Sequence, residues 1–457
     1  MQFIELKDYI LLPVYLFIIY FIAYRKRNNK YSIKNPLHRY YIPALTVKLL
    51  GAIAVGIVYQ YYYNGGGDTT QYFYNSKLVA DYFSTDPGSF IDLVFKPISI
   101  TMELHQRIPW GDAVFGFNES NFFPIRILAL LQLITINSYL PCAVILGAVS
   151  FTGIWKAFTA FVHMFPDLHK QFAIAFLFMP SVFFWGSGIL KDTITLSALC
   201  WLFFASYRVF ILRVKMLGSA FIILISIFVI IIVKPYIALA FLPSLIFWIF
   251  FQYRSAIRSY YLRVMALPFI VIIISMAGYY TINVIGESNK NFQLDNLTNK
   301  AANLNANLRA QDGAAFNIGV TNTSSTAELL KIAPLAITTT IFRPFVWEVR
   351  SIVMLFSSLE GLFIMYILYL IIARNGLIGM FKVISGIPLV TFCLIFALIF
   401  SFAVGFSTSN FGTLVRYKIP AIPFLMAGFF IVLDRGKKQV TGFTIKREHQ
   451  DSLGTSI

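Results

Sequence analysis

Long apolar segments recur from one end of this 457-residue sequence to the other. Each holds about 17 to 24 mostly apolar residues, enough for an α-helix to cross a hydrocarbon core of about 30 Å. The chain is 58% hydrophobic and only 12% charged, whereas soluble domains are about 25% charged. The sequence therefore excludes a soluble protein and predicts an all-α polytopic membrane protein.

The apolar segments predict about 11 transmembrane helices. Their expected ranges are 9–24, 41–62, 139–162, 171–187, 193–212, 217–234, 236–252, 264–284, 351–373, 384–405 and 419–433. The first segment follows Glu5 and Asp8 and precedes a basic cluster, which reverses the charge order of a cleaved signal peptide. We expect this helix to be retained with the N-terminus outside, and the odd number of spans then places the C-terminus in the cytoplasm.

Lysine and arginine residues concentrate in alternate loops and in the C-terminal tail. The loops that this topology assigns to the cytoplasm include the basic clusters at 25–39, 208–215 and 254–263, and the tail contains another at 435–447. This distribution follows the positive-inside rule and predicts a multi-pass inner-membrane protein. It also accounts for the net charge of +17, so no nucleic-acid partner is expected.

The predicted spans and loops divide the chain into successive parts. These are an N-terminal transmembrane helix with a basic cytoplasmic loop at 1–40, a transmembrane core at 41–284 with an external loop at 63–138, an external polar loop at 285–350, C-terminal transmembrane helices at 351–433, and a cytoplasmic tail at 434–457. Apolar and polar residues mix at helical spacing over 71–83, 89–105 and 121–137, which predicts interfacial helices in the first external loop. The polar stretch 288–326 could act as a lid.

The first candidate site residue is Asp68. It follows Gly65, Gly66 and Gly67 at the point where the second predicted helix leaves the membrane. Three glycines let a backbone turn sharply or approach a ligand closely. A carboxylate held there could act as a general base toward a sugar hydroxyl or bind a cation. The same residues also fit a flexible helix exit with a solvated aspartate, and the sequence does not decide between these interpretations.

Two external turns in the middle of the chain supply further candidates. Lys191 and Asp192 end a break between two predicted helices, at the tip of a hairpin. An ammonium at this interface is well placed for a lipid diphosphate, although the small residues of the turn also suit a tight hairpin without a ligand. Lys234 lies in the next external turn, where it either binds an anion or extends to the lipid headgroups.

Two external turns near the C-terminus supply the remaining candidates. The second external loop ends on Arg343, Trp347 and Glu348. An arginine fork there could hold a phosphate, and the tryptophan could face a sugar or anchor the chain at the interface. The last external turn contains Asn410, Arg416, Tyr417 and Lys418. Its basic residues lie on the side where the positive-inside rule disfavours them, which points to anion binding.

The sequence resembles the bacterial membrane glycosyltransferases of the GT-C type and the related polysaccharide polymerases. The resemblance lies in an acidic residue that opens a long external loop with membrane-lying helices, here Asp68 and 71–137, and in the segments Pro180 to Asp192, Arg343 to Glu348 and Asn410 to Pro420. It implies that Asp68 is the catalytic base and that Arg416, Lys191 and Arg343 bind a polyprenyl phosphate. Asp68 has no second acidic residue beside it, so the resemblance implies no obligatory cofactor and leaves a divalent metal as an option.

The resemblance implies transfer of sugar from a polyprenyl-phosphate-linked donor at the external face of the inner membrane. The expected partners are the polyprenyl-linked sugar or oligosaccharide, membrane lipids and envelope-biosynthesis proteins. A transporter or flippase of a lipid-linked glycan is one alternative, and a structural subunit of an envelope assembly is another. Transporters usually carry polar groups near the bilayer midplane and paired repeats. The sequence shows no convincing repeat and Glu360 is nearly alone at depth, so it favours the enzyme.

Overall fold

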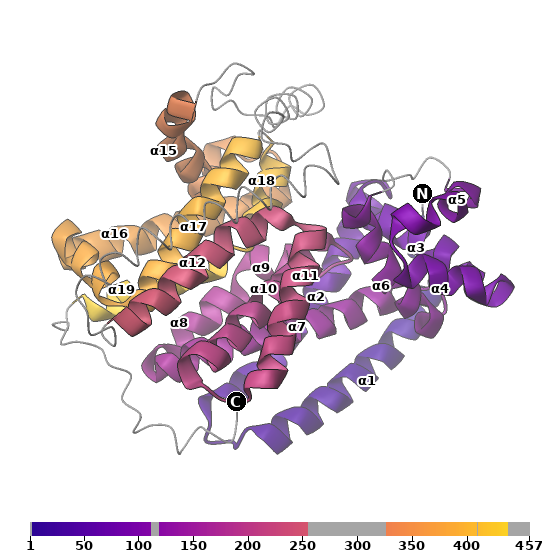
Figure 1. Cartoon of the computed structure of the whole chain (residues 1–457), viewed down its shortest axis with the longest axis horizontal. Coiled ribbons are helices and arrows are strands. Elements are labelled where there is room, and N and C mark those ends of the chain that lie inside the picture. The colour runs from indigo at the N-terminus through magenta and orange to yellow at the C-terminus, as the bar shows by residue number, and fades with distance from the viewer. Residues whose placement is uncertain (1, 111–117, 255–325, 409, 437–457) are drawn as a thin grey trace. The chain divides into compact units, whose positions relative to one another are not determined.

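The computed structural model describes residues 2–110, 118–254, 326–408 and 410–436, and this part of the chain is all-helical (Figure 1). It divides after Pro235 into two compact units, and each is described here by itself. Unit 1 contains α1 (Leu6–Lys30), α2 (Pro36–Ile57), η1 (Val58–Tyr62), α3 (Asp68–Thr85), α4 (Pro87–Phe95), α5 (Ile98–Arg107), α6 (Glu119–Thr135), α7 (Tyr139–Met164), η2 (Pro166–Leu168), α8 (His169–Ala173), η3 (Ile174–Phe178), α9 (Pro180–Trp185), α10 (Lys191–Ser206), η4 (Tyr207–Leu212) and α11 (Met216–Val233). Unit 2 contains α12 (Pro235–Tyr253), α15 (Thr326–Phe342), η7 (Val346–Glu348), α16 (Ile352–Gly386), α17 (Pro388–Ser407), α18 (Phe411–Tyr417) and α19 (Ile422–Arg435).

Eight helices in the described part of the chain are long and apolar enough to cross a membrane. They confirm the predicted apolar helices at 9–24, 41–62, 139–162, 193–212, 217–234, 236–252, 351–373 and 384–405. The prediction at 419–433 corresponds to α18 and α19, which pass the same test as a pair bent by 64°. The predicted span at 264–284 lies outside the described residues. The chain is therefore a multi-pass helical membrane protein.

The predicted single helix at 171–187 is wrong. α8 continues directly into η3, but Met179 between η3 and α9 is extended, with φ −66° and ψ 123°, and breaks the segment there. The cause is Pro180, because a proline ring clashes with the helical conformation of the preceding residue and supplies no N–H. Phe172 and Phe176 are nevertheless fully buried, so the segment packs inside unit 1.

The first predicted external loop is a folded helical body, α3–α6. Its helices confirm the predictions at 71–83 and 121–137, whereas the predicted helix at 89–105 is divided into α4 and α5 at Lys96 and Pro97. α3 and α6 pack against each other, and the Gln132 side-chain amide donates to the Phe73 carbonyl at 2.9 Å. The interfacial position of these helices remains a prediction.

If successive spans run in opposite directions, the start of α1, the end of η1 and the start of α7 must lie on the same side of unit 1. Gln60 at the end of η1 accepts hydrogen bonds from the Phe3 and Ile4 amides at 2.8 and 3.2 Å, and Asp8 accepts one from the Leu140 amide at 2.8 Å. The start of α1, the end of η1 and the start of α7 therefore lie together. At the opposite end of the same helices, the Trp155 indole donates to the Tyr31 hydroxyl at 2.7 Å.

Unit 2 has an aromatic core between α12, α17 and α19. The Phe241 ring meets those of Phe392, Phe396 and Phe424 edge to face, at centroid distances of 5.3, 5.0 and 5.8 Å. α15 packs on α17, where the Thr340 hydroxyl donates to the Ser401 carbonyl at 2.8 Å. The end of the predicted loop 285–350 thus contains a packed helix, whereas the proposed lid at 288–326 lies outside the described residues except for Thr326, the first residue of α15.

Gly51 is expected to be intolerant of any side chain, because α2 and α9 cross closely there. A Cβ at Gly51 would overlap the Phe183 carbonyl oxygen. We expect Gly51→Ala to lower the free energy of unfolding by about 1–3 kcal/mol, the usual cost of overpacking. Gly218→Ala in α11 is the matched control, since a Cβ there meets no atom within 4 Å. Thermal unfolding in detergent measures both variants, and equal midpoints would contradict the close crossing.

Candidate functional site

Three of the predicted site residues lie together in unit 1. The Asp192 carboxylate and the Lys234 ammonium form an ion pair at 2.5 Å. Beside it, the Lys191 ammonium donates to the Ser120 hydroxyl at 2.8 Å and to the Asn121 side-chain oxygen at 2.5 Å. We call these five residues the Lys191 cluster. It joins the start of α10, the end of α11 and the start of α6.

Helix ends explain why two charges of the Lys191 cluster, those of Asp192 and Lys234, occupy these positions. α10 begins at Lys191 because Leu190 is extended, with φ −141° and ψ 152°, so Asp192 lies in its first turn. Lys234 is the C-terminal cap residue of α11. A helix N-terminus favours an anion and a C-terminus favours a cation. The two helix dipoles and the ion pair therefore stabilise one another.

Burial makes the Asp192–Lys234 pair a structural element. The side chains are only 1% and 8% exposed, respectively. Removing one partner from a buried pair typically costs about 3–5 kcal/mol, because the other charge is left without compensation. The structure thus gives Lys234 a carboxylate partner, and its binding of a substrate anion stays a prediction. Lys191 is partly exposed and donates to two neutral oxygens.

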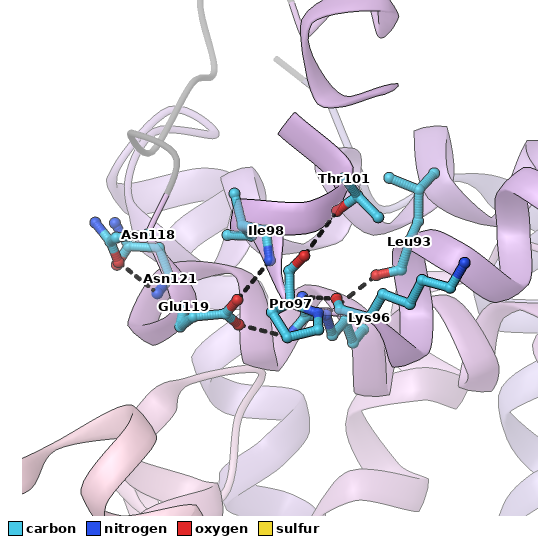
Figure 2. Close-up of polar contacts among 9 residues, drawn as sticks. Leu93, Lys96, Pro97, Ile98, Thr101, Asn118, Glu119 and Asn121 are labelled. Atoms are coloured by element: carbon cyan, nitrogen blue, oxygen red, sulfur yellow. Dashed lines mark hydrogen bonds and ion pairs between the residues drawn. The ribbon is translucent and has the colours of Figure 1, made fainter. Parts of the chain in front are cut away.

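A polar network fixes the start of α6, the helix end that carries Ser120 and Asn121, and Figure 2 shows this network around Asn118 and Glu119. Glu119 accepts a hydrogen bond from the Ile98 amide at 2.6 Å and pairs with Arg126 at 2.5 Å. Arg126 in turn donates to the Leu93 and Lys96 carbonyls at 3.1 and 2.6 Å. The Glu119 and Arg126 side chains therefore satisfy backbone carbonyls at the end of α4 and a backbone amide at the start of α5, on either side of the break between these helices.

The sequence interpretation missed Ser120, Asn121 and Arg126. Asn118 caps α6 by accepting the Asn121 amide at 2.9 Å, and an Asn followed by Glu is a helix-start pattern visible in the sequence. That pattern could have predicted where α6 begins. Nothing local could have predicted that Lys191, 70 residues away from Asn121, donates to its side chain.

Asp68 is the first residue of α3 and is partly exposed. The turn before it is tightly constructed. Gly67 has φ +94°, which favours glycine, and a Cβ there would lie 2.6 Å from the Tyr59 ring. On the other side, the buried Thr69 and Tyr139 hydroxyls lie 2.6 Å apart. The structure therefore holds Asp68 at a defined helix start, between contacts with η1 and α7.

A second group of predicted residues lies together in unit 2. The Arg343 guanidinium donates from Nε to both Glu348 carboxylate oxygens at 3.0 Å, and it lies 4.9 Å from the centre of the Phe411 ring. The buried Lys418 ammonium donates to the Arg343 carbonyl at 3.4 Å. We call Arg343, Glu348, Phe411 and Lys418 the Arg343 cluster. It joins the chain after α15 to both ends of α18.

The Glu348 carboxyl is ionised at neutral pH in this cluster. Burial alone would raise its pKa, but hydrogen bonds from Arg343 and from the Phe345 amide outweigh burial and hold the pKa below its ordinary value. A carboxyl with a lowered pKa stabilises the folded state above its unfolded pKa. That contribution is lost as the pH falls through the lowered pKa. The pair therefore stabilises unit 2 at neutral pH.

The other predicted residues of unit 2 differ in their surroundings. Trp347 is 80% exposed and its ring stacks on Phe345 at 4.9 Å. Asn410 caps α18 by accepting the Gly412 and Thr413 amides at 2.7 and 3.3 Å. Arg416 and Tyr417 are partly exposed in the last turn of α18. Asn410 therefore has a structural function, whereas Trp347 offers an open aromatic face.

Lys48 corrects the prediction that Glu360 is nearly alone at depth. It lies in the middle of α2, it is 3% exposed, and its ammonium donates to the Gly186 carbonyl. Glu360 is also 3% exposed, within α16. The sequence signal that could have predicted Lys48 is a lysine inside an apolar run. The scarcity of ionisable groups therefore argues less strongly against a transporter than the sequence suggested.

Neither a metal centre nor a known relative assists the assignment. Among the residues that the structure describes, no group of three or more His, Cys, Asp and Glu side chains is arranged to hold a metal ion. No protein-family model, curated protein or solved structure matches the chain. The chemical groups that bear on function are therefore those of the two clusters and Asp68.

Proposed function

We propose that this protein is a GT-C-like membrane glycosyltransferase or polysaccharide polymerase that uses a polyprenyl-phosphate-linked sugar donor. The observation that supports it is the helical body α3–α6. Asp68 begins its first helix, and Ser120 and Asn121 at the start of its last helix hold Lys191. One packed body thus presents a carboxylate and positions an ammonium, the two kinds of group that sugar transfer from a phosphate requires.

The proposed reaction uses this pair of charges in complementary ways. The Asp68 carboxylate takes the proton of an acceptor hydroxyl while the hydroxyl oxygen attacks the anomeric carbon of the donor sugar. The bond from that carbon to the phosphate oxygen breaks, and its electron pair leaves with the phosphate. Lys191 stabilises the charge that develops on the phosphate. For unit 2, the resemblance suggests that Arg343 and Arg416 bind a polyprenyl phosphate, and this is proposed of unit 2 by itself.

The proposed topology has about 11 spans, an external N-terminus and a cytoplasmic C-terminus in the bacterial inner membrane. A cysteine at Ser84 in α3 should then react with a membrane-impermeant maleimide on intact spheroplasts. A cysteine at Asn28 should react only after permeabilisation. Both positions are exposed, and the native Cys142, Cys200 and Cys393 are buried, so background labelling is expected to be low. Labelling of position 28 alone on intact cells would invert the topology.

A transporter of a lipid-linked glycan is the second candidate, because Lys48 is buried within a span. Purified protein in proteoliposomes distinguishes the two functions. A transferase moves labelled sugar from a polyprenyl-phosphate donor onto an acceptor supplied on one side of the membrane. A transporter moves the intact lipid-linked glycan across the bilayer without forming a new glycosidic bond. Translocation without sugar transfer would replace the proposed function.

A further inference from the structure

An apolar groove of about 370 Å³ lies within unit 1, between α6, α7, α10 and α11. These helices pack against one another in unit 1 (Figure 1). Five of its lining residues relate the groove to the Lys191 cluster: Ile127 of α6, Ile194, Ala198 and Trp201 of α10, and Val229 of α11. Ligand pockets usually measure about 300–1,000 Å³, so the groove is large enough for part of a lipid chain.

Helical spacing shows that the groove begins beneath the Lys191 cluster. On α10, Ile194 and Ala198 follow Lys191 at three and seven residues, the spacing of one helix face. On α6, Ile127 follows Ser120 at the same seven-residue spacing. On α11, Val229 lies one turn before Val233, whose carbonyl accepts the Ser120 hydroxyl at 2.9 Å. Three helices thus lead from the polar cluster into the groove.

The distance from Lys191 to the last groove residue of α10 matches one leaflet of a bilayer. Trp201 follows Lys191 by ten residues, a rise of about 15 Å along α10. That is half of a hydrocarbon core of about 30 Å. At this depth the Trp201 indole donates to the Thr152 hydroxyl at 3.2 Å, which ties α10 to α7. The groove therefore suits a chain that enters from one leaflet, with its polar head at Lys191.

We propose that this groove holds the first isoprene units of a polyprenyl phosphate, whose phosphate binds the Lys191 ammonium. The apolar lining matches the hydrocarbon, and the cationic end matches the phosphate. This inference rests on the proposed function for the choice of an isoprenoid. An ordinary phospholipid is the competing occupant, and the experiment separates the two.

The probe is geranylgeranyl phosphate with a diazirine at the end of its chain, added to the full-length protein in phosphatidylcholine nanodiscs. Photolysis and mass spectrometry should place the label on α7, α10 or α11 beside the groove. Unlabelled geranylgeranyl phosphate should compete, whereas phosphatidylglycerol should compete at least about tenfold less well. Equal competition by phosphatidylglycerol, or label confined to other helices, would overturn the proposal.

Matched variants test the two ends of the groove separately. Ile225 lines the groove at 45% exposure, whereas the neighbouring Leu224 is 67% exposed and does not line it. Ile225→Trp should reduce labelling by about tenfold by filling the groove, and Leu224→Trp should leave it unchanged. At the polar end, Lys191→Gln should weaken apparent affinity by about tenfold or more. Lys96→Gln, which alters an exposed lysine, should not.

The result remains informative whatever the catalytic outcome. Labelling in the groove combined with no sugar transfer by the wild type would support the lipid site and reject the transferase. Sugar transfer combined with labelling outside the groove would support the transferase and reject this site. Unaltered labelling in both Ile225→Trp and Lys191→Gln, with both variants folded by thermal unfolding, would also reject it.

Discussion

Asp68→Asn is expected to lower the turnover of sugar transfer by about 10²–10⁴-fold, the usual contribution of a general base. The amide keeps the shape of the side chain but cannot accept the acceptor's proton. Donor binding should change little, because the carboxylate acts in the transition state. Folding should be spared, since Asp68 is partly exposed in the first turn of α3 and asparagine is well tolerated near helix starts. Single-turnover transfer in proteoliposomes measures the effect.

Asp81→Asn is the matched control, because Asp81 is an exposed aspartate of the same helix. It should retain normal turnover. A chelator arm tests the alternative that Asp68 places a divalent metal: treatment of the wild type would then reproduce the loss, and added metal would restore it. Near-normal turnover of Asp68→Asn would show that Asp68 is not the general base and only begins helix α3.

The helices of this protein could be predicted because their signal is local. An apolar run such as Met216–Val233 needs no partner to be recognised as a membrane span, since every backbone group is satisfied within the helix. The signal for the break at Met179 is equally local, because Pro180 stands in the sequence, although an apolar run surrounds it. The composition of a segment shows that it is apolar, whereas a proline within it decides whether the helix is continuous.

The candidate site could be predicted only in part, for the same physical reason. Arg343 and Glu348 are five residues apart, so their pairing could be expected from the sequence. The partners of Lys191 are 70 and 71 residues away and depend on how α6 packs against α10 and α11. The pairing of Lys234 with Asp192 has no local signal either, since 42 residues separate them and only the packing of α10 against α11 brings them together.

Breaking the buried Asp192–Lys234 pair is expected to cost about 3–5 kcal/mol in the free energy of unfolding. Asp192→Leu leaves the buried Lys234 ammonium without its carboxylate, and Lys234→Met leaves the buried Asp192 carboxylate without its ammonium. The double variant Asp192→Leu/Lys234→Met should recover most of the loss, because both charges are removed together and apolar side chains can replace a buried pair. Unfolding in mixed micelles measures all three variants.

The exposed pair Asp92–Lys96, at 2.7 Å, provides the comparison. Its side chains are 39% and 50% exposed, so solvent screens the charges, and Lys96→Met should cost no more than about 1 kcal/mol.

The variants of Asp192 and Lys234 also decide what Lys234 does. If it is a structural partner, Lys234→Met loses stability and the double variant regains both stability and affinity for geranylgeranyl phosphate. If Lys234 instead binds the phosphate, Lys234→Met loses affinity with near-normal stability, and replacing Asp192 as well restores nothing.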